Sequence, residues 1–245
     1  MAIKKFKVQL VESKQIASNV KKLVLKRDDD GQFSFLPGQF ITLLFDNIDS
    51  KLIRRSYSIS STPEFTNLVE IAISYVHGGI ASKYLFKMQP GDKLNAMGPA
   101  GRLVLKDSEK IRKLVLVGTG TGIAPYRAML PTLQQALISN VDKIYIFLGV
   151  QYRADAVYAE DFREYSHKLT NLHFTACLSR EQQELFVDEQ KCYVQHCFDQ
   201  LNLEPKQDIV YLCGNPNMID DSFSLLTESG FDSKRVRREK YISSN

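Results

Sequence analysis

The 245-residue sequence contains only four cysteines, Cys177, Cys192, Cys197 and Cys213, and no two of them form a C-x-x-C pair. The usual spacings for zinc and for ferredoxin-type iron–sulfur clusters are therefore missing. A chain of this length also needs no disulfide bonds in order to fold. The sequence thus predicts no metal site, and its cysteine usage is typical of a reducing compartment, the cytoplasm.

Long hydrophobic runs are missing as well. The first seven residues, MAIKKFK, lack the apolar stretch of a signal peptide. No segment approaches the 18 consecutive apolar residues that a membrane-spanning helix needs. Hydrophobic residues make up 44% and charged residues 24% of the chain, which is ordinary for a globular protein. We therefore expect a soluble cytoplasmic protein with no membrane span.

A strong excess of one charge is also missing, because 32 Lys and Arg face 28 Asp and Glu. A net charge of +4 does not indicate a nucleic-acid-binding protein, in which basic residues are strongly clustered. One basic run stands out, KRVRREK at 234–240. Two interpretations remain open: the run steers an acidic partner, or it is a solvated final strand and tail.

The first half of the chain predicts short strands separated by turn signals. The expected strands are 20–26, 39–45, 55–60, 68–75 and 93–97. The turns between them carry Asp-Gly, Pro-Gly and Thr-Pro pairs. This succession of short strands and turns is typical of an antiparallel β-barrel, here interrupted by one helix over 80–87.

The second half predicts strands that alternate with helices. The expected strands are 113–117, 143–148, 172–178, 208–213 and 235–240, and the expected helices lie near 123–138, 157–168, 190–201 and 216–228. This alternation indicates an α/β domain with a parallel five-stranded sheet. We place the barrel domain at residues 1–107 and the α/β domain at 108–245.

A glycine-rich turn, GTGTG, follows the first strand of the α/β domain and precedes a helix. It comprises Gly118, Thr119, Gly120, Thr121 and Gly122. Glycines let the backbone approach a ligand, and the helix start offers free N–H groups to a phosphate. The spacing differs from the usual dinucleotide fingerprint, so a tight structural turn is the alternative interpretation.

Several further motifs occur in a fixed order along the chain. They are R-x-Y-S at 55–58, G-x-x-S at 79–82, the glycine turn, Ser-Arg at 179–180 with K-x-Y at 191–193, and C-G-x-P-x-M at 213–218. In this order the chain resembles the ferredoxin–NADP reductase superfamily over nearly its whole length. The resemblance implies that the barrel binds FAD and that the α/β domain binds NADPH.

For FAD, the resemblance implies that Arg55 holds the pyrophosphate, Tyr57 stacks on the isoalloxazine ring and Ser58 contacts the ring near N5. It also places the pyrophosphate at the start of the helix over 80–87. The residues there are Gly79, Ile80, Ala81 and Ser82. Tyr241, close to the end of the sequence, has two interpretations: it covers the flavin, or it anchors the tail.

For the coenzyme, the resemblance implies that the glycine turn carries the pyrophosphate, with Thr121 near the nicotinamide. Ser179, Arg180 and Lys191 would bind the 2′-phosphate, and Tyr193 would stack on adenine. In the last motif, Cys213 would lie beside nicotinamide C4. The remaining coenzyme residues implied there are Gly214 and Met218.

The function implied is an NADPH-dependent oxidoreductase in which Tyr57, Ser58 and Cys213 are the catalytic residues. Hydride passes to FAD, and electrons pass on to a small acidic carrier, ferredoxin or flavodoxin. A reductase of free flavin or of an oxygenase component is an alternative. A non-enzymatic binding module that keeps the fold is the alternative of a different class.

Overall fold

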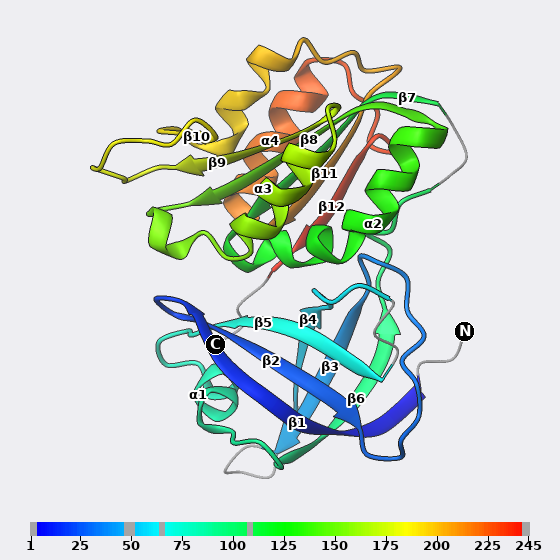
Figure 1. Cartoon of the computed structure of the whole chain (residues 1–245), viewed down its shortest axis with the longest axis vertical. Helices are drawn as coiled ribbons and strands as arrows, with labels where there is room; N and C mark the ends of the chain where they lie inside the picture. The colour runs from blue at the N-terminus through cyan, green and yellow to red at the C-terminus, as the bar shows by residue number, and fades with distance from the viewer. Residues whose placement is uncertain (1–3, 47–51, 64–66, 107–109, 242–245) are drawn as a thin grey trace. The chain divides into compact units, whose positions relative to one another are not determined.

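The computed structural model describes residues 4–46, 52–63, 67–106 and 110–241 (Figure 1). The chain divides into two compact units. The first holds the described residues up to Val104 together with Ala124–Met129, and the second holds Leu105–Ile123 and the described residues from Leu130 onward. The predicted boundary between residues 107 and 108 lies outside the described residues. In these ranges no helix is both long and apolar enough to cross a membrane.

The first unit contains six antiparallel strands in the order β4-β3-β6-β1-β2-β5. Its elements are β1 (Lys4–Ala17), β2 (Val20–Arg27), β3 (Phe40–Asp46), β4 (Leu52–Ser58), β5 (Leu68–Ser74), α1 (Ile80–Lys87) and β6 (Lys93–Ala100). The edge strands meet, because Ile59, just after β4, pairs with Ile71 in β5. The Ser60 N–H also donates to the Glu70 carbonyl over 2.8 Å. The sheet thus closes on itself, which confirms the predicted barrel.

Alternating side chains build the barrel core. In β2, Leu23 and Leu25 are fully buried, whereas Lys22 and Lys26 keep partial exposure, as expected of a strand with one face inside. Helix α1 adds Ala81 and Leu85 to the same core.

The longest strand, β1, was not among the strands expected from the sequence. Its register with β2 shifts between Leu10 and Glu12, and again between Gln15 and Ala17. Phe6, Val8 and Leu10 alternate toward the core before the first shift, so this part of β1 was predictable, and the bulges interrupt the alternation only after Leu10.

The second unit contains a six-stranded parallel sheet in the order β10-β9-β8-β7-β11-β12. Its strands are β7 (Ile111–Thr119), β8 (Val141–Val150), β9 (Leu172–Leu178), β10 (Glu189–Gln190), β11 (Ile209–Gly214) and β12 (Val236–Lys240). Its helices are α2 (Ala124–Ser139), α3 (Ala159–Lys168) and α4 (Pro216–Glu228), with short 3₁₀ turns at η1 (Gly120–Ile123), η2 (Arg153–Asp155), η3 (Val194–Cys197) and η4 (Asp199–Leu201). The predicted parallel sheet is confirmed with one extra strand, because β10 is too short to recognise from the sequence.

Helices cover both faces of this sheet. On one face, Val115 and Val117 of β7 share a buried cluster with Ile219 of α4. On the other, Phe162 of α3 stacks on Phe174 of β9 with ring centroids 5.4 Å apart. Because the inner strands β7 and β11 are buried on both sides, they read as largely apolar runs.

The helix expected near 190–201 is wrong. That segment forms β10 and the two short turns η3 and η4. Val194, Cys197 and Leu201 are buried at spacings of three and four residues. A 3₁₀ turn with three residues per turn buries nearly the same positions as an α-helix, so the pattern could not separate the two.

Candidate active site

The R-x-Y-S motif lies in β4, opposite β3, with Arg55 paired with Leu43 and Tyr57 with Ile41. Because side chains alternate along a strand, Arg55 and Tyr57 project from the same face. Tyr57 is partly buried against the barrel core, and Ser58 is buried. Burial raises the pKa of the Tyr57 hydroxyl well above its usual range, and the nearby Arg55 charge offsets this only in part. One face of β4 therefore presents a cation beside a neutral aromatic ring.

The G-x-x-S motif forms the start of α1. Gly79 is the N-cap, and no side chain caps the helix. The Ser82 hydroxyl accepts the Val76 N–H over 3.1 Å and lies 3.0 Å from the Val76 carbonyl, to which it donates. Ser82 thus fastens the turn before the helix. The backbone N–H groups of Ile80 and Ala81 are the donors best suited to an anion here.

In the second unit, the turns after β7 and β11 contact each other at the carboxyl edge of the parallel sheet. Cys213 pairs with Gly118. The Asn215 N–H donates to Thr119 Oγ1 over 2.8 Å. Gly214 has φ of +118°, and a Cβ there would lie 2.5 Å from Thr119 Oγ1. Only glycine fits between the two turns, and ligands of α/β folds bind at this edge of the sheet.

The three glycines of the GTGTG turn have different roles. A Cβ on Gly118 would lie 2.8 Å from the Ile123 nitrogen, and one on Gly122 would lie 2.4 Å from the Cys213 carbonyl oxygen. Gly120 has φ of +53°, and a Cβ there would meet nothing within 4 Å. Gly118 and Gly122 are therefore needed for packing. Gly120 is where the backbone faces open space and can approach a phosphate.

This difference can be tested with two matched variants. Gly122→Ala should lower the free energy of unfolding by about 1–3 kcal/mol, because the new methyl group overlaps a backbone carbonyl. Gly120→Ala should cost about 1–2 kcal/mol at most, from its left-handed backbone alone. Urea denaturation without coenzyme measures both values. Gly120→Ala should instead raise the KM for the coenzyme, and a Gly120→Ala variant with an unchanged KM would contradict the assignment.

Cys213 is completely buried in β11. Burial raises its pKa well above the usual range, the Glu239 charge adds to this, and a hydrogen bond with Tyr241 offsets it in part. The Tyr241 N–H donates to the Gly214 carbonyl over 2.8 Å. The structure thus brings Tyr241 to Cys213. A protonated, enclosed thiol contributes shape to the site rather than a nucleophile.

The start of α4 contains a residue that the sequence analysis missed. The Asn215 side chain accepts the N–H of Asn217 over 2.8 Å and that of Met218 over 3.4 Å. Asn215 is therefore the N-cap of α4, with Pro216 at the first helical position. An asparagine followed by proline is a known helix-start signal and could have revealed this role. Met218 itself is buried.

Strand β10 brings the two parts of the predicted 2′-phosphate site together. Gln190 pairs with Cys177 of β9 in parallel register. Lys191 follows β10, and Ser179 and Arg180 follow β9, so these residues leave the sheet at neighbouring positions. Arg180 and Lys191 are both exposed.

The acidic residues near this site are already paired. Arg153 binds Glu189 with an N–O distance of 2.6 Å, and Arg163 binds Asp188 over 2.7 Å. The hydrogen bond from Arg153 is also the main reason why the pKa of Glu189 is lowered. Over the described ranges no carboxylate forms an ion pair with Arg180 or Lys191. Two basic side chains are thus available to a phosphate, and the pairing role of Arg153 had no signal in the sequence.

Tyr193 is 59% exposed although it is a large aromatic residue. Its only described ring partner is His196, which meets it edge-on at 6.1 Å between centroids. The flat face of the ring is therefore available to a planar group, as adenine stacking requires.

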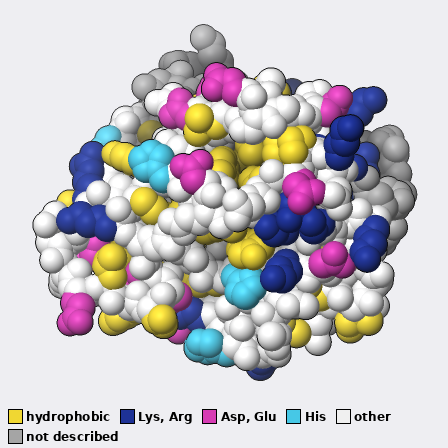
Figure 2. Space-filling model, turned by 90° about the horizontal axis from the view of Figure 1, so that it is seen from above, with side chains coloured by type: hydrophobic (Ala, Val, Ile, Leu, Met, Phe, Trp, Pro, Cys, Tyr) yellow, Lys and Arg dark blue, Asp and Glu magenta, His cyan; other side chains and the backbone are white. Residues whose placement is uncertain are grey.

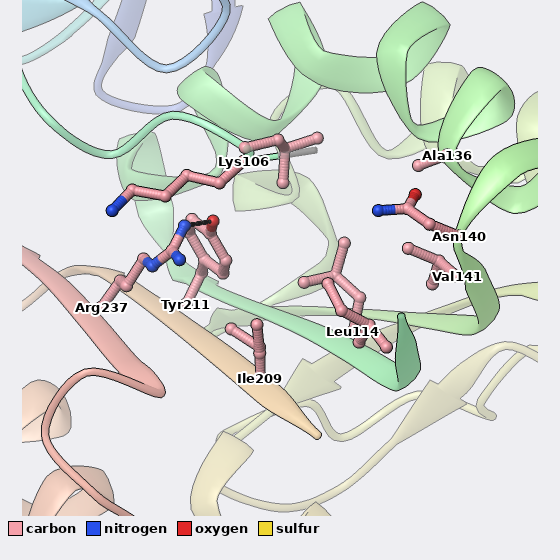
Figure 3. Close-up of a pocket in the computed structure, with 10 residues that line it drawn as sticks. Lys106, Leu114, Ala136, Asn140, Val141, Ile209, Tyr211 and Arg237 are labelled. Carbon is pink, nitrogen blue, oxygen red and sulfur yellow. Dashed lines mark hydrogen bonds between the residues drawn. The ribbon is translucent and has the colours of Figure 1, made fainter. Parts of the chain in front are cut away.

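A small pocket occupies a different part of the second unit (Figure 3). Ile111, Val141 and Ile209 line it, and they are the first residues of β7, β8 and β11. Figure 3 shows the Arg237 side chain directed at the Tyr211 hydroxyl, to which it donates a hydrogen bond. The pocket thus lies at the amino ends of the strands and contains none of the predicted cofactor residues.

Two family models match the chain along these units. An oxidoreductase FAD-binding domain model covers residues 7–105, and an oxidoreductase NAD-binding domain model covers residues 116–223. The chain belongs to the ferredoxin–NADP reductase superfamily. Members of this superfamily are oxidoreductases, so the chain is an enzyme that uses FAD and a nicotinamide dinucleotide. The hypothesis of a non-enzymatic module is therefore not supported.

Known members of the superfamily resemble the chain at moderate identity. Ferredoxin–NADP reductase B of Sorangium cellulosum is 29% identical over 175 residues, covering 71% of this chain and 70% of the relative. The toluate 1,2-dioxygenase electron transfer component of Pseudomonas putida is 26% identical over 232 residues, covering 94% of this chain and 66% of the relative. The chain thus spans about two thirds of these relatives' lengths.

A solved structure of a ferredoxin NADP⁺ reductase from Neisseria gonorrhoeae, with bound FAD and NADP, shares the fold. It has a TM-score of 0.82 at 21% identity, and the match covers 97% of this chain and 98% of that one. At this identity the likeness establishes the fold alone.

Proposed function

We propose that the protein oxidises NADPH and passes the electrons through FAD to a ferredoxin or flavodoxin, with an FAD domain at residues 1–107 and an NADP domain at 108–245. The observation that carries the coenzyme choice is that Arg180 and Lys191 follow the two paired strands β9 and β10, both exposed and both without a described carboxylate partner. A 2′-phosphate dianion is the group that this pair of cations fits.

The residues of the chain fit FAD and the coenzyme as follows. FAD, when bound, supplies the chemistry of accepting a hydride and releasing electrons singly. Arg55 holds the FAD pyrophosphate together with the N–H groups at the start of α1, and Tyr57 covers the flavin ring with Ser58 beside it. Two observations support this fit to FAD. Arg55 and the uncharged Tyr57 ring project from the same face of β4, and no side chain caps the start of α1.

On the coenzyme side, the backbone at Gly120 binds the pyrophosphate, because its surroundings are open. Thr121 positions the nicotinamide, and the buried Cys213 thiol fixes the shape of the site around it. Tyr193 stacks on adenine with its exposed ring face. These groups orient the coenzyme, and hydride transfer needs no acid–base pair of the protein.

A reductase component of an oxygenase is the second candidate. The observation that favours it is the likeness to relatives with that description, such as the toluate dioxygenase electron transfer component and the propane 2-monooxygenase reductase of Mycolicibacterium smegmatis. Turnover of NADPH with ferredoxin, flavodoxin, free FMN and an oxygenase component would separate the candidates. Reduction of FMN alone would indicate a free-flavin reductase. If none of these acceptors were reduced, all three candidate functions (ferredoxin or flavodoxin reductase, oxygenase reductase and free-flavin reductase) would be refuted.

The C-terminal basic run is partly occupied by internal contacts. Arg237 binds Tyr211, the Arg238 guanidinium lies 3.5 Å from the centroid of the Phe223 ring, and Lys240 pairs with Asp220 at 2.6 Å. On the face drawn in Figure 2, basic and acidic side chains are interspersed. Of the two most central arginines, the exposed Arg238 is therefore the better candidate for steering a partner, because Arg237 is half-buried and held by Tyr211.

An acidic carrier should respond to Arg238 and to salt. Arg238→Glu should lower the second-order rate constant for ferredoxin or flavodoxin reduction at low ionic strength, since steering depends on surface charge. The wild-type rate should fall as salt rises. Stopped-flow measurements would show this, with Lys143→Glu, at the other end of the sheet, as the matched control. If the rate constant with acidic carriers changed neither with salt nor in the Arg238→Glu variant, steering by this strand would be refuted.

A further inference from the structure

Three of the four cysteines meet inside the second unit. Cys177 is the second-last residue of β9, Cys192 follows β10, and Cys197 ends the turn η3. The Sγ atoms of Cys177 and Cys197 are 3.4 Å apart, and those of Cys192 and Cys197 are 3.7 Å apart. All three sulfurs lie within 4.8 Å of one another. Their sequence spacing hid this cluster, because the pairing of β9 with β10 is what brings them together.

A fourth donor faces the same point. The Gln190 Oε1 atom lies 3.7 Å from the Cys197 sulfur and 3.9 Å from the Cys192 sulfur. Gln190 is held there because its backbone pairs with Cys177. Three sulfurs and one oxygen therefore converge from four positions of the chain.

The spacing of these atoms matches metal coordination. In a tetrahedral zinc site with Zn–S bonds of about 2.3 Å, neighbouring sulfurs lie roughly 3.8 Å apart, and a sulfur and an oxygen lie roughly 3.6 Å apart. The S–S distances of 3.4 and 3.7 Å and the S–O distances of 3.7 and 3.9 Å are close to these values.

The surroundings suit a soft metal ion. Cys177 is 1% exposed and Cys197 is 2% exposed, within an apolar cluster that includes Val194 and Phe198. Cys192 is only partly buried, which gives an ion a way in. Thiolate ligands select thiophilic ions over magnesium or calcium.

We propose that Cys177, Cys192 and Cys197, with the Gln190 side-chain oxygen, bind one thiophilic divalent metal ion such as Zn²⁺. Binding converts the three thiols to thiolates and releases three protons to the solvent. The ion ties the end of β9 to the segment 190–197 and stabilises the second unit. This site does not depend on which coenzyme or electron acceptor the enzyme uses.

The test uses Cd²⁺ as the probe on the flavin-loaded protein kept under a metal-free reductant. Equilibrium dialysis with elemental analysis should find one Cd²⁺ per chain, with the ultraviolet absorption of cadmium bound to thiolates. Cys197→Ser should abolish this tight binding, because Cys197 lies next to both other sulfurs. Cys213→Ser, which alters the remaining cysteine, should leave it intact.

Folding of the variants is monitored separately, so that a damaged core is not mistaken for a lost ligand. Gln190→Ala leaves all three sulfurs and should weaken Cd²⁺ binding without removing the thiolate absorption. Equimolar Cd²⁺ should raise the melting temperature of the wild type and of Cys213→Ser, but not that of Cys197→Ser. A wild type that binds no more Cd²⁺ than the Cys197→Ser variant overturns the proposal.

Discussion

An Arg180→Ala variant is expected to oxidise NADPH with a kcat/KM about 10 to 150 times lower than the wild type, and to use NADH almost unchanged. A hydrogen bond to a charged group contributes about 1.5–3 kcal/mol, and about 1.4 kcal/mol corresponds to a factor of ten. Arg180 is exposed, follows β9 directly and forms no ion pair with a described carboxylate. Its charge is therefore free for a coenzyme phosphate, which only NADPH carries at the 2′ position.

The control for this experiment is Lys143→Ala. Lys143 is exposed in the same unit, but it lies near the start of β8, at the edge of the sheet opposite the candidate site. Steady-state kinetics of both variants with both coenzymes give the comparison. If the wild type used the two coenzymes equally well, or if Arg180→Ala impaired both to the same degree, the 2′-phosphate site would be refuted.

The fold was largely predictable because local patterns and long-range structure agree in this chain. Helices α1 and α4 begin and end at the predicted residues, since the first follows a Gly-Gly turn and the second begins at Pro216 directly after its N-cap Asn215. Strand β10, with two residues, has no pattern of its own and exists only because β9 lies beside it. Elements that depend on a neighbour in this way cannot be recognised from one sequence.

The candidate site was predictable only as a set of motifs. The order of R-x-Y-S, the glycine turn and C-G-x-P-x-M indicated the superfamily, and the family models support it. The sequence could not show that Gly122 packs on the Cys213 carbonyl while Gly120 faces open space, because that difference arises from contact between two distant turns. The cysteine cluster was missed for the same reason.

The residue pair Arg54 and Arg55 offers a sharp test of the FAD site. Arg55→Ala should weaken FAD binding by about 10 to 150 times, since a charge-assisted contact with the pyrophosphate contributes about 1.5–3 kcal/mol. The neighbouring Arg54 is exposed and projects from the opposite face of β4. Arg54→Ala removes the same charge from the same strand and should leave FAD affinity unchanged.

The two variants are compared by flavin content on purification and by titration of the flavin-free protein with FAD, followed by fluorescence. Circular dichroism should show an intact barrel in both, because neither side chain belongs to the buried core. Affinity for NADP⁺ should change less than affinity for FAD in Arg55→Ala, since the coenzyme residues lie in the other unit. An Arg55→Ala protein that retains FAD as tightly as Arg54→Ala would show that the pyrophosphate is held elsewhere, with the start of α1 as the remaining candidate.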